Sequence, residues 1–506
     1  MPRFDIPAKV TGAMQYGIDL SLPDMLQAAV MGAPVHGGKL VSVDPAPAMR
    51  FAGVERVLKL ESSVAVVAKS FWQARRALAA LQPVFDHAGN GGVSTKTLFD
   101  QQDGLLAAGN ASRVHKSGDA DAVLKATPRE RIVEASYRVP FLHHAAMEPI
   151  NATAQFKDGR LTVWAGEQDA LGSRAALAKA LGLAADKVTL NALPVGGAFG
   201  RRIAATSQYL TQVAEIAKAL SPRPVKMIWT REEDFAQGAY RPAVSTRIRA
   251  SLGPDGRPTA WSQVYVNLTG PGRREGHHLP YDIPAQAISA VESATHVRTG
   301  TWRSVGHSQH AFYTECFIDE LAHAAGRDPF DYRRQLLPQG SRPRKVLELV
   351  AEKADWGKPL DAGVARGIAL VESFGTIVAH VIEASTRADG TPRVHRVTAA
   401  VDCGDVCHPD NASAQVEGAV IMGLSAAIGE QITIANGAVV QKNFPDYPLL
   451  TFADAPPRID VHFLRSDAPW GGLGEPGLPP VAPALANALF AASGARKRML
   501  PLTASG

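Results

Sequence analysis

The stretch that decides the fold is Gly471–Gly494, "GGLGEPGLPPVAPALANALFAASG", where a glycine-rich loop runs directly into an apolar segment. Proline is tolerated in the first turn of a helix and glycine often ends one, so we predict a proline-opened helix that stops at Gly494. Glu475 is the acidic residue of the loop, on backbone that glycine and proline shape. This pattern predicts either a catalytic carboxylate or a surface turn whose glutamate complements a helix N-terminus.

The totals are those of a globular chain of several domains. Its 506 residues predict roughly three domains, and the 46% hydrophobic and 20% charged content is ordinary. Basic and acidic residues are interspersed, and the tightest basic cluster, Arg496–Arg498, is too short to indicate nucleic-acid binding. Three cysteines exclude a disulfide framework and a four-thiolate iron–sulfur cluster within this sequence. No stretch reaches the roughly 18 apolar residues that span a bilayer.

The order of apolar runs and turns predicts an α+β fold. Strand-length runs followed by a helical segment predict a small α/β domain over residues 1–90. Residues 91–125, rich in Gly, Asn, Ser and Asp, are interpreted as a linker. Two α+β domains follow, over residues 126–340 and 341–506. Within them we predict a helix that ends at Gly326 and a second that begins with Asp328 as N-cap and Pro329.

Three further glycine-bearing segments accompany the first: "PVGGAFGRR" at 194–202, "GTWRSVGHSQ" at 300–309 and "AQVEG" at 414–418. One such loop is weak evidence, but the set is more specific. Together with "PRFDIPAKVTG" and "NFPDY", it resembles the molybdopterin-binding large subunit of the xanthine dehydrogenase and aldehyde oxidoreductase family. The isoquinoline 1-oxidoreductase type of β subunit is the most similar. The resemblance implies a hammerhead-like domain at residues 1–90 and two molybdopterin-binding domains after it.

The resemblance assigns roles to the loop residues. Family members hydroxylate an electron-poor carbon with oxygen taken from water, and a glutamate acts as the base. Glu475 matches that glutamate, and loss of a general base typically costs about 10²–10⁴-fold in rate. The molybdenum takes no protein ligand in this family. The implied cofactor-binding residues are Gln168, Gly197, Ala198, Phe199, Gly200, Trp302, Arg303, Gln415 and Gly474.

Two departures from the family pattern concern the substrate pocket. Purine-hydroxylating members carry a carboxylate where this chain has Ile203, and an aromatic residue where it has Val305. An apolar pair leaves the hydrogen-bonding groups of a purine unpaired, which disfavours xanthine. Aldehydes and aromatic N-heterocycles both remain as substrate classes.

The resemblance also implies partners and a cofactor form. Bacterial members usually carry molybdopterin cytosine dinucleotide with molybdenum, and their [2Fe–2S] clusters lie in a small two-cluster subunit, with a cytochrome c as a further electron acceptor. The family's "GQG" pterin loop does not occur in this sequence, so we expect a separate chain to supply it. Two compartments stay open: the cytoplasm, or the periplasm after export with a signal-bearing partner.

Parts of the sequence are also compatible with two rival functions. A non-catalytic assembly or cofactor-carrying subunit is disfavoured by the presence of Glu475, Gln168 and Arg303. A nucleotide-binding dehydrogenase would use the G-x-G-x-x-G spacing at 472–477, but Glu475 inside that loop would repel a pyrophosphate.

Two cysteine- and histidine-bearing motifs invite metal assignments that we disfavour. The stretch Cys403–His408 has one residue too many for haem attachment and is interpreted as a turn after a strand. His143 and His144, with Glu148, are predicted to have packed or hydrogen-bonded roles.

Overall fold

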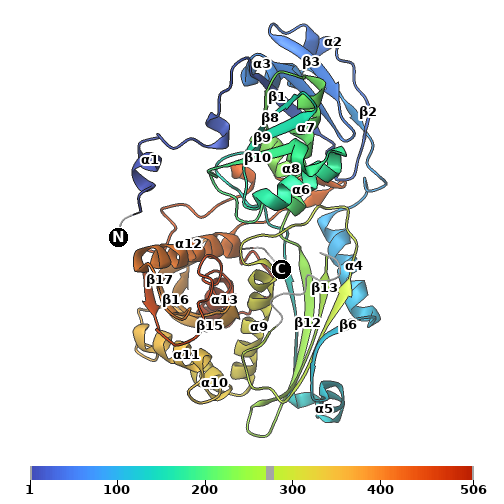
Figure 1. The fold of residues 1–506 in the computed structure, drawn as a ribbon. Coiled ribbons are helices and arrows are strands. Elements are labelled where there is room, and N and C mark those ends of the chain that lie inside the picture. The colour runs from blue at the N-terminus through green and yellow to red at the C-terminus, as the bar shows by residue number, and fades with distance from the viewer. Residues whose placement is uncertain (1–2, 269–277, 504–506) are drawn as a thin grey trace.

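The computed structural model describes residues 3–268 and 278–503. It has the predicted α+β class, with helices and sheets arranged in two bodies (Figure 1). One body, at the top of the view, is built on a seven-stranded sheet. The other holds a five-stranded and a four-stranded sheet on either side of helix α9 (Val305–Ala324).

The seven-stranded sheet draws its strands from two distant parts of the chain. Its order is β10 (Val188–Leu193), β9 (Arg160–Gly166), β8 (Asn151–Lys157), β11 (Val225–Ile228), β1 (Leu26–Gly32), β4 (Ser63–Ala68) and β3 (Val54–Lys59). Helices of this body are α2 (Ala46–Met49), α3 (Phe71–Ala79), α6 (Ala170–Leu181), α7 (Gln208–Ala219) and α8 (Arg231–Ala236). Side chains alternate between faces along a strand, so Ala28 joins the core under α7 while Ala29 joins the core under α3.

Strands β1, β3 and β4 of the first 90 residues share one sheet with strands from later in the chain. Strand β1 pairs in parallel with β11, with Leu26 opposite Val225, and pairs antiparallel with β4 on its other side. The predicted boundary at residue 90 therefore separates strands that share one sheet. A parallel partner some 200 residues away leaves no local sequence signal, because periodicity reports a strand and not its neighbour.

The linker predicted for residues 91–125 is wrong in its secondary structure. The segment forms α4 (Thr95–Ala108), β6 (Ser112–Ser117) and α5 (Ala120–Ala126), and β6 pairs with β14 (Ala285–Glu292). The polar residues that suggested a loop are helix caps. Ser94 accepts from the Thr97 N–H, Gly109 closes the helix in the left-handed region, and Asp119 caps α5.

The second body is assembled around the buried helices α9 and α13. The five-stranded sheet has the order β6, β14, β13 (Pro258–Asn267), β12 (Val244–Leu252) and β7 (Ile132–Val139). The four-stranded sheet has the order β15 (Ala365–Ser373), β16 (Thr376–Thr386), β17 (Pro392–Asp402) and β20 (Ile459–Phe463). Helices α10 (Pro329–Gln335), α11 (Arg342–Lys353), α12 (Pro409–Ile428) and α13 (Val481–Ser493) complete this body. Short elements elsewhere are α1 (Ile6–Val10) and the pairs β2 (Leu40–Ser42) with β5 (Val84–Phe85) and β18 (Ile434–Ala435) with β19 (Ala438–Val439).

Three predicted helix boundaries are confirmed. Helix α13 ends at Ser493, with Gly494 in the left-handed region, and α9 ends two residues before Gly326. Asp328 caps α10 by accepting from the N–H groups of Phe330 and Asp331.

Helix α13 lies in direct backbone contact with β15, and Gly367 permits that contact. A Cβ at this position would lie 2.1 Å from the Ala484 carbonyl oxygen and 2.2 Å from the Ala488 nitrogen. Asn487 of α13 donates to the Ile368 carbonyl over 3.2 Å, which fixes the register of helix against strand. Any side chain at 367 must push α13 away.

We expect Gly367→Ala to lower the free energy of unfolding by about 1–3 kcal/mol, because overpacking displaces backbone rather than a side chain. Gly104→Ala in α4 is the matched control. A Cβ there meets nothing within 4 Å, so the helix should gain up to about 1 kcal/mol. Thermal unfolding of both variants checks the sign, and equal effects would contradict the close approach.

A buried ionic cluster ties α9 to its neighbours. Arg333 of α10 is fully buried, with Nε 3.0 Å from Glu315 Oε2 and Nη1 3.5 Å from Asp319 Oδ1. Glu315 also accepts from the Tyr281 hydroxyl and the Leu370 N–H, so its lone pairs are well used. Burial acts to lower the pKa of the Arg333 guanidinium, but the Glu315 carboxylate raises it above the ordinary value.

In the two described ranges, 3–268 and 278–503, no helix combines the length and apolar character needed to cross a membrane.

Candidate active site

The glycine loop, Gly196–Gly200, projects from the end of β10 in an unusual backbone conformation. Gly197 and Gly200 have φ of 105° and 104°, and Phe199 between them has φ of 54°. A Cβ at Gly200 would lie 2.5 Å from the Thr301 carbonyl oxygen, so only glycine fits against the facing loop. The loop thereby presents main chain, and the 39% exposed Phe199 side chain, at its tip.

Two side chains hold the glycine loop in place. Glu148 Oε2 accepts from the Gly196 N–H at 2.9 Å, and its other oxygen accepts from the Ile18 N–H at 3.2 Å. Gln168 Oε1 accepts from the N–H groups of Gly200 and Arg202 at 3.1 and 3.4 Å. Because the Gln168 oxygen is engaged by the loop, its exposed amide nitrogen is the end that can donate outward.

The Thr301–Ser304 stretch brings the separate motifs together. Thr301 Oγ1 donates to the Gly200 carbonyl at 3.0 Å. Arg303 donates from Nε to the Gly474 carbonyl at 2.7 Å and from Nη2 to the Gln415 carbonyl at 3.1 Å. Ser304 Oγ donates to the Glu475 carbonyl at 2.7 Å. Four segments far apart in sequence thus meet at one place.

Arg303 and Glu475 form the charged centre of this place. Burial lowers the pKa of the Arg303 guanidinium below its ordinary value, and the nearby Glu475 carboxylate opposes that shift. Glu475 itself is half-buried, on backbone fixed by the Ser304 bond. A guanidinium beside a fixed carboxylate can bind an anionic group while the carboxylate accepts a proton.

A cleft of about 620 Å³ opens beside Arg303. It is lined by His144, Ala145, Met147, Gly196, Gly197, Phe199, Arg303, Gly418, Ile421, Met422, Ser425, Glu430, Leu449 and Leu450. This is the usual volume of a cofactor or ligand site. A Cβ at Gly474 would meet nothing within 4 Å, and one at Gly418 would first meet Arg303 Nη1 at 4.0 Å. Glycine main chain, open space and one guanidinium make a cradle that fits a pterin with an anionic tail.

The predicted site residues fall into four groups by position. Gly197, Phe199 and Arg303 line the cleft, and Gln168, Gln415, Gly474 and Glu475 join it through the bonds above. Ala198 and Trp302 are buried, at 5% and 1% exposed, and the Trp302 indole donates to the His143 carbonyl. Ile203 and Val305 lie half-buried at the ends of the glycine loop and of the Thr301–Ser304 stretch, outside the lining of this cleft.

The packed roles predicted for the histidine pair are confirmed. His143 stacks on Phe235 with ring centroids 4.3 Å apart, and His144 Nε2 bonds the Thr301 carbonyl at 2.7 Å. Burial lowers the pKa of both imidazoles to about 3. Cys403 follows β17 in a turn, also as predicted, and His408 caps α12. The described part of the chain holds no group of three His, Cys, Asp or Glu residues placed to bind a metal.

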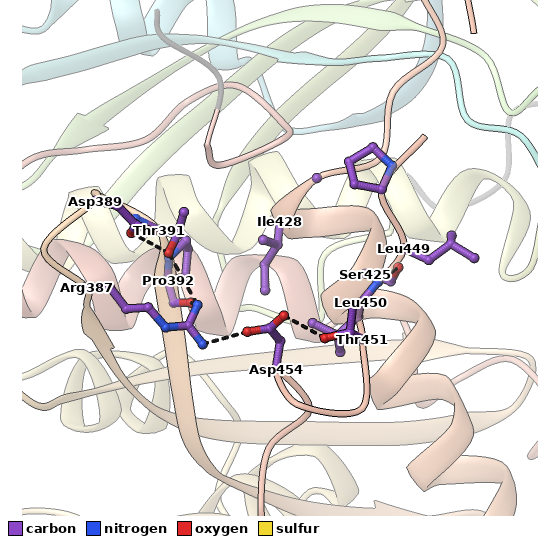
Figure 2. Close-up of a pocket in the computed structure, with 12 residues that line it drawn as sticks. Arg387, Asp389, Thr391, Pro392, Ser425, Ile428, Leu449, Leu450, Thr451 and Asp454 are labelled. Atoms are coloured by element: carbon purple, nitrogen blue, oxygen red, sulfur yellow. Dashed lines mark hydrogen bonds and ion pairs between the residues drawn. The ribbon is translucent and has the colours of Figure 1, made fainter. Parts of the chain in front are cut away.

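A second pocket of about 340 Å³ adjoins the cleft and shares Ser425, Leu449 and Leu450 with it. Figure 2 shows its polar side: Arg387 from the β16–β17 turn faces Asp454 from the segment after Leu450, and Arg387 also donates to Thr391 of the same turn. Arg387 donates to Asp454 Oδ1 at 2.9 Å, and Thr451 Oγ1 donates to Asp454 Oδ2 at 2.7 Å. The Arg387 bond holds the 448–454 segment against the β16–β17 turn, and the Thr451 bond lies within the segment.

Four residues that support the site escaped the sequence analysis in this role: Thr301, Ser304, Glu148 and Glu430. Ser304 was quoted with its motif, but its left-handed φ of 75° and its bond to Glu475 have no local signature. Glu148 had no local signal either, because the contact that gives it this role is not made with a neighbour in the chain. Its partner Gly196 lies 48 positions away.

Comparison with known proteins gives one consistent result. Residues 106–337 and 354–456 match two family models, each described as a molybdopterin cofactor-binding domain. The chain is 34% identical to isoquinoline 1-oxidoreductase subunit beta of Brevundimonas diminuta, covering 99% of this chain and 67% of the relative. It is 31% identical to a Gluconacetobacter polyoxogenes protein named membrane-bound aldehyde dehydrogenase (pyrroloquinoline-quinone), covering 99% and 71%.

The fold matches that of solved enzymes. The crystal structure of quinoline 2-oxidoreductase from Pseudomonas putida 86 superposes with a TM-score of 0.84 at 16% identity, covering 99% of this chain and 96% of that one. The two family-model matches and the alignment over 99% of the chain agree. The chain belongs to the molybdopterin-binding subunits of the xanthine dehydrogenase and aldehyde oxidoreductase family of molybdenum-dependent oxidoreductases.

Proposed function

We propose that this subunit hydroxylates an electron-poor carbon of an aldehyde or aromatic N-heterocycle with oxygen from water, and that Glu475 is the general base. The observation that carries the proposal is the Thr301–Ser304 stretch, which joins the glycine loop, Gln415, Gly474 and Glu475 at one cleft. That convergence supports a catalytic site rather than four unrelated turns.

Each side chain has a distinct task in this proposal. When bound, the molybdenum cofactor supplies the oxidation of the substrate carbon and takes up two electrons. The Glu475 carboxylate accepts the proton released by the water-derived oxygen as it attacks carbon. Arg303 would hold the anionic part of the cofactor, and the Gln168 amide nitrogen would donate a hydrogen bond to the bound cofactor. The glycine loop lets these contacts approach without a side chain between them.

The substrate class follows from the relatives and from two residues. Proteins named for isoquinoline, quinoline and aldehyde oxidation are all similar to this chain. Ile203 and Val305 are apolar where a purine-hydroxylating site needs polar and aromatic partners, which supports an apolar ring or aldehyde over xanthine.

We also propose the cytosine dinucleotide form of the cofactor and a two-cluster [2Fe–2S] partner that receives the electrons. The relatives named as subunits support a multi-chain enzyme. The expectation that a separate chain carries the "GQG" loop stays a prediction, as does a cytochrome c acceptor.

Purified together with its natural partners, the complex is expected to contain about one molybdenum per copy of this chain and to reduce a dye with N-heterocycles or aldehydes but not with xanthine. Metal analysis and a substrate screen check this. A loaded complex that oxidises none of these compounds would instead favour the cofactor-carrying role.

A further inference from the structure

Glu430 is a buried carboxyl that lines the cleft and has no task in the proposed reaction. It is 3% exposed and lies just after α12. Three groups face it: the Ser425 hydroxyl of α12, the Tyr447 hydroxyl at 2.8 Å, and the Arg241 guanidinium from the segment before β12. Burial raises the pKa of Glu430 to about 7, against the hydrogen bonds from Ser425 and Tyr447 and the charge of Arg241.

The Tyr447 hydroxyl has one proton and two acceptors within reach. These are Glu430 Oε2 at 2.8 Å and the His143 carbonyl oxygen at 3.1 Å, while the His143 N–H donates to the hydroxyl at 2.9 Å. An ionised Glu430 only accepts, so it takes the Tyr447 proton. A protonated Glu430 donates to the phenolic oxygen instead and leaves the Tyr447 proton for His143. The proton on Glu430 thus decides how many hydrogen bonds hold the His143 main chain.

The segment His143–His144 is bonded to the Thr301–Ser304 stretch, which carries Arg303. The next residue, His144, bonds the Thr301 carbonyl at 2.7 Å, and Thr301 donates to Gly200 at 3.0 Å. Trp302 donates its indole N–H to the His143 carbonyl at 3.3 Å. A change in the hold on His143 therefore reaches the Thr301–Ser304 stretch through two bonds.

The segment that carries Tyr447 is fixed from its other side. The Leu450 N–H donates to Ser425 Oγ at 2.9 Å. Beyond it, Thr451 and Arg387 bond Asp454, as Figure 2 shows. Since Tyr447 is anchored in this way, the bond that changes with the proton on Glu430 is the one from the Tyr447 hydroxyl to the His143 carbonyl.

We propose that Glu430 is a positioning residue whose protonated carboxyl, acting through Tyr447, holds the His143–His144 segment under the Thr301–Ser304 stretch and so keeps Arg303 and Glu475 in working geometry. The inference rests on the proposed function. Of the other ionisable groups at the cleft, His144 stays neutral near pH 7 because burial lowers its pKa to about 3, and Arg303 stays charged.

The test measures kcat/KM of the assembled molybdenum enzyme from about pH 6 to pH 9 for the wild type and Glu430→Gln. The glutamine amide donates to Tyr447 at every pH, as the protonated acid does. Dividing the two profiles cancels the pH effects that both enzymes share. The ratio of variant to wild type is expected to rise about two- to tenfold with pH, the factor of one neutral hydrogen bond. A constant ratio overturns the proposal.

Two further variants separate positioning from packing. In a Tyr447→Phe background the relay is absent, so adding Glu430→Gln should leave the pH profile unchanged. A pH-dependent ratio that persists there also overturns the proposal. Glu233→Gln is the matched control: Glu233 is a buried carboxyl of α8 whose pKa burial raises to about 8, but it accepts from the Gly32 N–H away from the cleft. Its ratio should stay flat.

A stability measurement tests the protonation independently of turnover. The folded pKa of Glu430 is raised from 4.5 to about 7, so its stabilising contribution is complete below about pH 4.5 and is lost as pH rises through 7. Glu430→Gln should therefore flatten part of the fall in Tm between pH 5 and 8, and an unaltered fall contradicts the assigned protonation. A wild-type complex without turnover refutes the proposed function, whereas active wild type with a flat kcat/KM ratio refutes this inference alone.

Discussion

Glu475→Gln is expected to lower kcat of the assembled enzyme by at least about 10²-fold, and up to about 10⁴-fold, because an amide cannot accept the proton that the attacking oxygen must lose. The variant should keep its molybdenum content, since the Glu475 main chain, which bonds Ser304, is unchanged. KM should change little, because the loss falls on the chemical step.

Steady-state kinetics with metal analysis on the same preparation check this. Glu352→Gln is the control, a surface carboxylate on α11 bonded to Lys353, and it should turn over like the wild type. Near-normal kcat with full molybdenum in Glu475→Gln would remove this residue from the mechanism. A loss that merely tracks missing molybdenum would assign it to cofactor retention instead.

Arg333→Met is expected to cause the largest loss of stability, about 3–5 kcal/mol, because it leaves Glu315 buried without its cation, while Asp319 keeps its pair with Arg496. In a thermal melt this corresponds to a fall in Tm on the order of 10 °C for the body built around α9. Adding Glu315→Gln should recover part of the loss, since the uncompensated carboxylate is then removed.

The matched control is Lys96→Met, which breaks an exposed pair between Lys96 and Asp100 on α4. Such pairs contribute about 0.5 kcal/mol or less, so its melt should overlay that of the wild type. If both variants melted alike, the cluster under α9 would not be a structural anchor.

What the sequence predicted well was governed by neighbours in the chain. The proline at the start of α10, the Asp328 cap and Gly494 each act within one helical turn, so the helix ends they predict are confirmed. The α+β class follows from the same local periodicity. The loop predicted for residues 91–125 is wrong because its local signals are ambiguous: Ser94 and Gly109 are typical of loops and of helix caps alike.

The candidate site shows the same division. Its motifs could be recognised in the sequence, and their expected roles came from the resemblance to the family. Their meeting place depends on bonds such as Arg303 to Gly474, across 171 positions, which no periodicity encodes. No motif in the sequence surrounds Glu430. Its role is inferred from its burial and from its hydrogen bond with Tyr447, which lies 17 residues further along the chain.

Strand β1 lies inside the seven-stranded sheet, between β11 and β4, rather than at an edge. Removing it would cut the sheet in two and uncover a row of unsatisfied amides and carbonyls on each half, the surfaces through which sheets aggregate. Nascent chains face the same hazard until residue 228 has left the ribosome, because β11 supplies the last neighbour that β1 needs.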